Sequence, residues 1–392
     1  MVENLVLLTG ATGMIGFKTL AELLENGYTV RAAVRNQAGF DRISSLPSVQ
    51  KYKPQLTSFI VPDITVPGAY DEAVKGVKYI VHIASPLAGN NGPDYENSLI
   101  RPAIQGTVGI LESALKTTGI QRVVITASVA SIASSARIAT GKVVDGRSII
   151  PWTSGNARRA FPHADNPQKT LLQSRRNLHL QTTLRPTLPP RPSRTKLPRT
   201  LSPLASRPYD VINIMPVFVF GRDETVTEAS SIAKGTNGIL MGPILGHARD
   251  YPFGVAGVHV DDVAKMHVLA LDPKVAGNQD FLAASAEPGS VDWAESFEIV
   301  KRRYPEEYAD GVFKFDSIAK PATTVARVDS TKATRVLGVQ FKPFEEQVVS
   351  VVDHFLELIG RTSWLLALRA IGWGGFTPVK NVCVAQTHAT GI

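Results

Sequence analysis

The chain has 392 residues, of which 44% are hydrophobic, and it carries a formal net charge of +8. This length and apolar content exclude disorder of the whole chain and suit one large or two modest domains. The positive charge is confined to residues 158–208, where nine Arg and two Lys accompany a single acid, so this segment carries +10 and the remainder −2. A protein that is basic throughout is therefore excluded.

The cysteine content and the apolar segments indicate the compartment. Cys383 is the only cysteine, which permits neither an internal disulfide nor a cysteine-based metal site. The N-terminus has no basic region, and its apolar run Leu5–Leu8 is too short for a signal peptide. The apolar stretch 364–379 contains Arg369 and three glycines, so it falls short of a membrane span. We therefore expect a cytoplasmic protein with no membrane partner.

The first 157 residues alternate short β-branched runs with helical periodicity, a pattern typical of βαβ units around a parallel sheet. The predicted strands are Leu5–Leu8, Thr29–Val34, Ser58–Val61, Tyr79–Ile83 and Arg122–Thr126. The helices predicted between them are Ile15–Asn26, Tyr70–Lys75 and Ile100–Thr117. The sequence therefore predicts an α/β fold with a doubly wound parallel sheet, and a first domain over residues 1–157.

Regular patterning stops between residues 158 and 208, which contain nine prolines and no sustained period. Because proline removes amide donors and restricts its neighbour, we predict an irregular, basic, Pro/Arg-rich insertion there. A sixth strand is predicted at Tyr209–Met215. Residues 209–360 are predicted to add the last sheet strand or strands and a smaller C-terminal substrate-binding lobe, and residues 361–392 a tail. The helices predicted after the sixth strand are Asp261–Leu271, Val291–Arg303 and Phe344–Leu358.

The strongest chemical signal is a glycine-rich run that follows the first predicted strand and opens the next helix: Gly10-Ala11-Thr12-Gly13-Met14-Ile15-Gly16. Gly10 and Gly13 permit a tight turn and let backbone amides approach a pyrophosphate, while Gly16 allows the helix to pack closely on the strand. The run therefore predicts a Rossmann-type dinucleotide site, with Thr12, Met14 and Ile15 beside the glycines as cofactor-binding residues.

The residues after the second and third strands bear on the choice of dinucleotide. Arg35 stands where an NAD-preferring site would place an acid for the ribose 2′-hydroxyl. An arginine there would pair with a 2′-phosphate, which favours NADP (NADPH) over NAD, although a solvated surface arginine is the alternative. Asp63 and Ile64 are candidates to border the adenine, and Asp63 is equally a candidate turn residue.

Further motifs follow in the order of a known family: Val81–Pro86, Gly106-Thr107, Val123–Ser128, Asn213–Gly221 and Val258–Ala264. With the glycine-rich run, they resemble the extended short-chain dehydrogenase/reductases of the NAD-dependent epimerase/dehydratase family. The resemblance is to the dihydroflavonol-reductase-like branch and to fungal ketone or aldehyde reductases in particular. It covers roughly residues 1–157 and 209–360.

The resemblance implies that NADPH delivers hydride to a small carbonyl compound, or that the reverse alcohol oxidation occurs. A serine hydrogen-bonds the carbonyl, a tyrosine acts as general acid, and a lysine four residues later lowers the tyrosine pKa. Ser128 matches the serine, although a strand-end serine that bonds local backbone is the alternative. The resemblance also implies cofactor contacts at Ala84, Ser85, Pro86, Thr126, Pro216 and Val219.

The tyrosine and lysine of this mechanism are missing. None of the nine tyrosines has a lysine at the fourth position after it, and no tyrosine lies between Tyr95 and Tyr209. Two interpretations stay open. Either the protein is a non-catalytic NADP-binding pseudoenzyme that lost its general acid, or residues 158–208 come from a coding sequence translated in the wrong frame or through an intron.

Other polar residues have simpler interpretations. His82 and His259 are predicted to be buried, hydrogen-bonded structural histidines, and Asp261 and Asp262 to cap a helix. The basic segment 158–208 lacks the aromatic residues of a single-strand binder, so no specific nucleic-acid partner is expected. The sequence predicts no metal site, and it leaves the individual substrate and the oligomeric state open.

Overall fold

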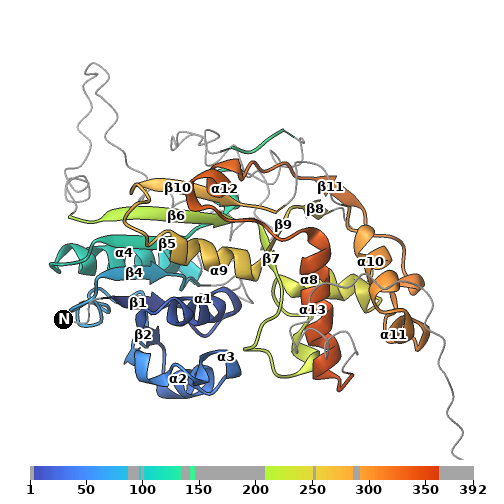
Figure 1. The fold of residues 1–392 in the computed structure, drawn as a ribbon, viewed down its shortest axis with the longest axis horizontal. Helices are drawn as coiled ribbons and strands as arrows, with labels where there is room; N and C mark the ends of the chain where they lie inside the picture. Colours follow the sequence, from blue (N-terminus) through green and yellow to red (C-terminus); the bar gives the residue numbers. More distant parts are fainter. Residues whose placement is uncertain are drawn as a thin grey trace, which may run out of the picture.

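The computed structural model describes residues 4–86, 97–98, 101–133, 142–145, 208–249, 253–285 and 292–361 (Figure 1). Almost all of the predicted irregular segment 158–208 and of the predicted tail 361–392 lies outside these residues. The domain boundaries at residues 157 and 361 therefore stay predictions.

A seven-stranded sheet forms the centre of the described structure, with the strand order β10-β6-β5-β4-β1-β2-β3. All of its neighbouring strands are parallel. The strands are β1 (Leu5–Thr9), β2 (Thr29–Val34), β3 (Leu56–Ile60), β4 (Tyr79–His82), β5 (Arg122–Thr126), β6 (Asp210–Pro216) and β10 (Gln279–Ala283). The chain winds outward from β1 in one direction through β3 and in the other through β4, which confirms the predicted doubly wound α/β fold.

Helices cover both faces of this sheet, which explains why the first four residues of β1 are all apolar. On one face Val6 and Leu8 pack in a cluster with residues of α1 (Met14–Glu25) and α9 (Val260–Leu269). On the other face Leu5 and Leu7 pack in a cluster with residues of α4 (Arg101–Leu115). Successive side chains of a strand point to opposite faces, so all four leucine and valine side chains are buried.

A smaller lobe lies at one end of the sheet, where Figure 1 shows α8, α10, α11 and α13 together. Its core is rich in aromatic rings, with Trp293 edge-on to both Phe220 and Phe344. The helices of the lobe are α8 (Asn237–Ile244), α10 (Glu295–Arg303), α11 (Pro305–Ala309) and α13 (Phe344–Leu358). The predicted C-terminal lobe is thus present, packed around its own apolar cluster.

The remaining elements are short. Two pairs of short parallel strands join the lobe to the sheet, β7 (Phe218–Phe220) with β9 (Gly257–His259) and β8 (Phe253–Val255) with β11 (Thr323–Val325). The other α-helices among the described residues are α2 (Gln37–Ser44), α3 (Pro47–Gln50) and α12 (Thr331–Leu337). Short 3₁₀ helices are η1 (Lys53–Gln55), η3 (Val129–Ser131), η6 (Ala229–Ser231) and η7 (Phe315–Ser317).

One ion pair joins strands that lie on either side of residues 158–208. Arg122 on β5 donates from Nε and Nη2 to the carboxylate of Asp210 on β6, at 2.6 and 2.9 Å. Its remaining N–H groups donate to the carbonyls of Ala270, Asp272 and Val275 at 2.7–2.8 Å. All five guanidinium N–H groups are therefore used, and the chain after residue 208 is bonded to the chain before it.

The predicted helix at Tyr70–Lys75 is wrong, because the structure has a series of turns there. Gly68 and Gly76 bracket the segment with φ of 76° and 72°, a conformation that interrupts a helix on both sides. Tyr70 and Val74 are nevertheless buried under the sheet. The four-residue spacing of Tyr70 and Val74, which predicted a helix, therefore arises from turns that bury both side chains.

Candidate functional site

The predicted site residues lie at the carboxyl ends of neighbouring strands. Gly10 follows β1, Arg35 follows β2, Ala84 lies just after β4, and Ser128 lies just after β5. The strand order reverses between β1 and β4, and open α/β sheets bind ligands in the crevice at such a switch point. The fold therefore brings these residues to one edge, although they are far apart in the sequence.

The three glycines of the run have different structural roles. Gly10 has φ +78°, and a Cβ there would lie 2.7 Å from the amide nitrogen of Ala84. A Cβ on Gly16 would lie 1.9 Å from the carbonyl oxygen of Gly10, so α1 packs directly on the turn. A Cβ on Gly13 would meet nothing closer than 3.9 Å. Gly10 and Gly16 are thus required by packing, whereas Gly13 leaves open space in front of the helix.

The N-terminus of α1 is suited to an anion. Gly13 is its N-cap residue and makes no side-chain cap, and the first turn contains no acidic residue. The first amides of a helix have no carbonyl partner within it, and the helix dipole adds partial positive charge there. Open space at Gly13 beside an uncapped helix fits a pyrophosphate, so the residues present match a dinucleotide.

A buried network beneath the glycine-rich run fixes the segment after β4. Oγ1 of Thr9 accepts the amides of Ile83 and Ala84, both at 3.1 Å, and lies 2.9 Å from Nδ1 of His82. With its lone pairs occupied, the threonine hydroxyl donates to Nδ1, and Nε2 of His82 then donates to Thr107 at 3.3 Å. Burial lowers the pKa of His82 to about 4. This histidine is therefore neutral and structural, as predicted.

Arg35 and Asp63 are neighbours at the ends of β2 and β3. Arg35 is exposed. Asp63 accepts from the amide and hydroxyl of Thr65 at 2.8 and 2.7 Å, and these bonds lower its pKa, with a smaller contribution from the positive charge of Arg35. Asp63 therefore forms a turn, which was one of its two predicted roles. Ile64 packs against α4 where Gly106 has no side chain, since a Cβ there would lie 2.8 Å from its Cδ1.

Ser128 is half-buried at the N-cap of η3. Its Oγ accepts the amide of Ala130 at 3.3 Å, a local bond that leaves the hydroxyl proton available for another acceptor. Thr126 is bonded to His267, whose Nδ1 donates to the carbonyl of Val263 at 2.7 Å and whose Nε2 accepts the Thr126 hydroxyl at 2.7 Å. The hydroxyl proton of Thr126 is thus committed to a hydrogen bond within the protein.

The other predicted contacts differ in what they offer a ligand. Ala84, Ser85 and Pro86 are partly exposed beside the glycine-rich run. Pro216 is the buried last residue of β6, and the side chain of Val219 is 4% exposed within the core. Val219 therefore has little side-chain surface left for a cofactor.

The cap of α9 differs from the prediction. His259 accepts the amide of Asp261 at 3.1 Å and caps the helix, while Asp261 itself pairs with Lys18 at 2.9 Å and with Lys342 at 2.6 Å. Asp262 accepts the amide of Lys342 at 2.8 Å. The two aspartates bind lysines and a backbone amide of other segments, so the prediction that they cap the helix is wrong. His259 is buried as predicted.

Sequence analysis missed Thr9 and His267. Thr9 directly precedes Gly10 at the end of a buried strand, a position that could have marked it. His267 lies on α9, and nothing in its local sequence indicates that its ring reaches Thr126 on β5.

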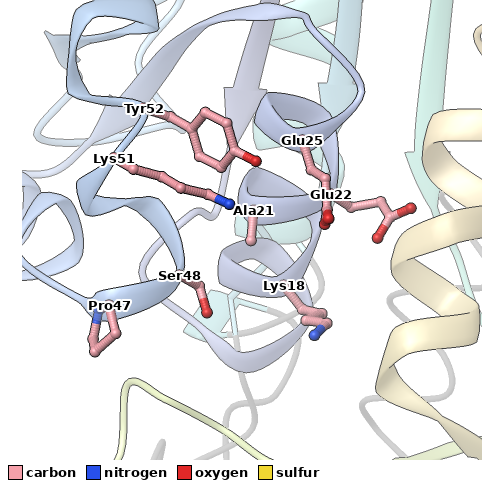
Figure 2. A pocket seen from close by; sticks show the side chains of 8 residues that line it. All are labelled: Lys18, Ala21, Glu22, Glu25, Pro47, Ser48, Lys51 and Tyr52. Atoms are coloured by element: carbon pink, nitrogen blue, oxygen red, sulfur yellow. The ribbon is translucent and has the colours of Figure 1, made fainter. Parts of the chain in front are cut away.

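A polar groove lies between α1 and α3 (Figure 2). Its lining contains none of the predicted site residues and consists of Lys18, Ala21, Glu22, Glu25, Pro47, Ser48, Lys51 and Tyr52. The groove is therefore separate from the crevice at the strand ends. Within the part of the chain that the structure describes, no helix is long and apolar enough to cross a membrane.

Comparisons with known proteins agree with this geometry. A model of the NAD dependent epimerase/dehydratase family matches residues 6–141. Ketoreductase CTB6 of Cercospora nicotianae is 35% identical over 364 residues, which cover 91% of this chain and 96% of that protein. The chain belongs to the NAD-dependent epimerase/dehydratase family. A second family relative, NAD-dependent epimerase/dehydratase FUM13 of Gibberella moniliformis, is 31% identical over 91% of this chain and 96% of that protein.

Solved structures show the same fold. The structure of Gre2 from Candida albicans in complex with NADPH superposes with a TM-score of 0.71 at 23% identity, covering 91% of this chain and 99% of that one. Vestitone reductase from alfalfa gives 0.60 at 21% identity, covering 92% and 100%. The Rossmann-type family fold is therefore present on both sides of the segment 158–208.

The extent of the match bears on that segment. Because the match to ketoreductase CTB6 covers 91% of this chain, only about 35 of the 392 residues lie outside it. The segment 158–208 has 51 residues, so the match runs through part of it.

Proposed function

We propose that this protein carries the NADP(H) site of a carbonyl reductase, whose reaction is hydride transfer between the nicotinamide and a small aldehyde or ketone. The observation that carries the proposal is the exposed Arg35 at the end of β2, beside the uncapped N-terminus of α1. An arginine in that position suits a 2′-phosphate, whereas NAD sites place an acid there. The ketoreductase relative and the NADPH complex of Gre2 support the same cofactor and reaction.

The residues of this chain have separate roles in the proposed site. The first amides of α1 hold the pyrophosphate at Gly13, and Arg35 holds the 2′-phosphate. Asp63 and Ile64 border the adenine, and Ala84, Ser85 and Pro86 lie along the opposite side of the crevice. NADPH supplies the hydride when it is bound. The hydroxyl of Ser128 would donate a hydrogen bond to the substrate carbonyl oxygen and so orient it, while keeping its proton.

The general acid is the missing part of this site. Proton delivery to the carbonyl oxygen requires a group whose pKa is tuned for transfer, and the family uses a tyrosine with a lysine four residues later. No such pair exists in the sequence. Tyr209, which follows the segment 158–208, is buried and donates to the carbonyl of Leu111 at 2.8 Å, so it is committed elsewhere. This absence supports a second function, a non-catalytic NADP-binding protein.

Cofactor binding and turnover by the purified chain separate these functions. We would titrate NADPH by fluorescence and follow NADPH oxidation with a panel of aldehydes and ketones. Binding with oxidation supports the reductase, and a Ser128→Ala variant should then lower kcat with little change in NADPH affinity. Binding without oxidation of NADPH leaves only the non-catalytic function. Absence of NADPH binding contradicts both.

A further inference from the structure

A loop that follows β7 is fixed in place by its own hydrogen bonds. Asp223 accepts the amide and the hydroxyl of Thr225 at 3.0 and 2.7 Å, and the amide of Val226 donates to the Asp223 carbonyl at 2.9 Å. These bonds set the direction of the Thr225 carbonyl. A group that holds this carbonyl therefore holds the whole turn.

Arg42, near the end of α2, bridges this loop to the glycine-rich run. Its Nη1 donates to the carbonyl of Thr225 at 3.0 Å, and its Nη2 donates to the carbonyl of Thr12 at 3.2 Å. The two carbonyls belong to segments more than 200 residues apart in the sequence. The planar guanidinium bonds the two carbonyls through two separate nitrogens, whereas a lysine ammonium would have to reach both from a single nitrogen.

Other contacts reinforce the same connection. The hydroxyl of Ser48, at the edge of the groove in Figure 2, donates to the carboxylate of Glu224 in the loop. Asn237, the first residue of α8, donates to the carbonyl of Gly221 at 2.8 Å and lies 3.7 Å from the sulfur of Met14. Besides the Arg42 bridge, the later segment therefore contacts the glycine-rich run at Met14 and α3 at Ser48.

The loop is also bonded to the far side of the lobe. Arg222 pairs with Glu357 on α13 through both terminal nitrogens, at 2.7 and 2.6 Å, and its amide donates to the hydroxyl of Ser350 at 2.9 Å. A continuous series of bonds thus runs from Thr12 through Arg42 and the loop to α13. These bonds connect the glycine-rich turn to the helix that supports the aromatic core of the lobe.

We propose that Arg42 is a positioning residue that couples the dinucleotide-binding turn to the C-terminal lobe by holding the carbonyls of Thr12 and Thr225 together. This inference rests on the proposed NADP(H) site, since it assigns the turn as the place where the pyrophosphate binds. In this proposal Arg42 acts through the carbonyl of Thr12, and not through a contact of its own with the dinucleotide. Its removal should therefore weaken NADPH and NADH equally, because the two dinucleotides share the pyrophosphate and differ only at the 2′-phosphate.

The binding test compares Arg42→Ala and Arg42→Lys with Arg335→Ala, an exposed arginine on α12, as the matched control. We expect both Arg42 variants to lose about three- to tenfold in affinity for NADPH and for NADH alike. Arg42→Lys keeps the positive charge but has only one nitrogen. If this variant does not restore the affinity, the bonds to the two carbonyls matter and the charge alone does not. A loss confined to NADPH and restored by lysine would overturn the proposal in favour of a direct phosphate contact. Unchanged affinity for both dinucleotides would overturn it as well.

A second readout needs no cofactor. Hydrogen exchange of the apo protein, followed on peptides that cover residues 10–16 and 222–228, should become faster in both segments in the Arg42 variants and stay unchanged in Arg335→Ala. Unchanged exchange in residues 222–228 would overturn the coupling. If the parent chain binds neither dinucleotide, the proposed function fails on that result alone, while the exchange data still decide whether Arg42 couples the two segments.

Discussion

Replacing Arg122 by leucine should destabilise the fold strongly, because this residue bonds the chain after residue 208 to the sheet built before it. The Arg122 side chain is 7% exposed and that of Asp210 is 26% exposed. The substitution removes two bonds to a carboxylate and leaves three backbone carbonyls without the guanidinium. Removing one partner of a buried ion pair costs about 3–5 kcal/mol, and we expect a loss in that range.

Equilibrium unfolding in urea, followed by circular dichroism, measures this loss. Arg361→Leu is the matched control, because Arg361 pairs with Asp310 at 2.6 Å on the surface, where such pairs contribute less than about 1 kcal/mol. If Arg122→Leu yields no folded protein, Asp210→Asn is the alternative. It keeps the shape of the Asp210 side chain, removes only its charge, and should destabilise the protein less. A loss for Arg122→Leu no larger than that for Arg361→Leu would refute the reasoning that β6 is bonded to β5 through this pair.

Three further predictions concern the site. Gly16→Ala should destabilise the protein and abolish dinucleotide binding, because the alanine Cβ would lie 1.9 Å from the Gly10 carbonyl oxygen. Gly13→Ala is the control and should leave urea unfolding nearly unchanged, because a Cβ there would meet nothing closer than 3.9 Å. Asn36→Ala should cost about 1 kcal/mol, since Asn36 caps α2 by accepting the amide of Gly39 at 2.9 Å. The third prediction is pH dependence. Burial lowers the pKa of His82 and His267 to about 4. As the pH falls below about 6.5, these histidines become protonated in the unfolded chain, whereas in the folded chain they stay neutral until about pH 4. Stability should therefore fall as the pH drops through this window, by up to about 3 kcal/mol for each histidine. Burial raises the pKa of Asp262 to about 6, so the folded chain binds this proton at a higher pH than the unfolded chain does. Protonation of Asp262 therefore offsets part of this loss of stability. Urea titrations between pH 7 and pH 4.5 that show no loss of stability would contradict the assignment of both histidines as buried and neutral.

Much of the sheet and the glycine-rich turn at its edge could be predicted because their signals are local. A strand buried on both faces has a continuous apolar run, and a glycine-rich turn between such a run and a helix has few alternatives. β2, β5 and α13 therefore match their predicted bounds in full, β1 is one residue longer than predicted, and α1 is shifted by one residue at each end. β10 was not predicted, because it is a short edge strand that begins with Gln279-Asp280.

The interactions that connect distant segments could not be predicted from the sequence. Arg42 is an ordinary basic residue in the last turn of a helix, and only the fold places the Thr225 carbonyl beside it. The hydrogen-bond and ion-pair partners of Asp261 and Asp262 were missed for the same reason. Two aspartates in a first turn suggest capping, and their lysine partners lie on α1 and just before α13. Tertiary contacts therefore override the local preference at both places.

Titration of the purified chain with NADPH and with NADH tests the central claim most directly, because the claim assigns an NADP(H) site to the crevice between Gly13 and Arg35. We predict saturable binding of both, with NADPH the tighter, and loss of that preference in Arg35→Ala. Absence of saturable NADPH binding, or a preference for NADH in the parent chain, would contradict the account.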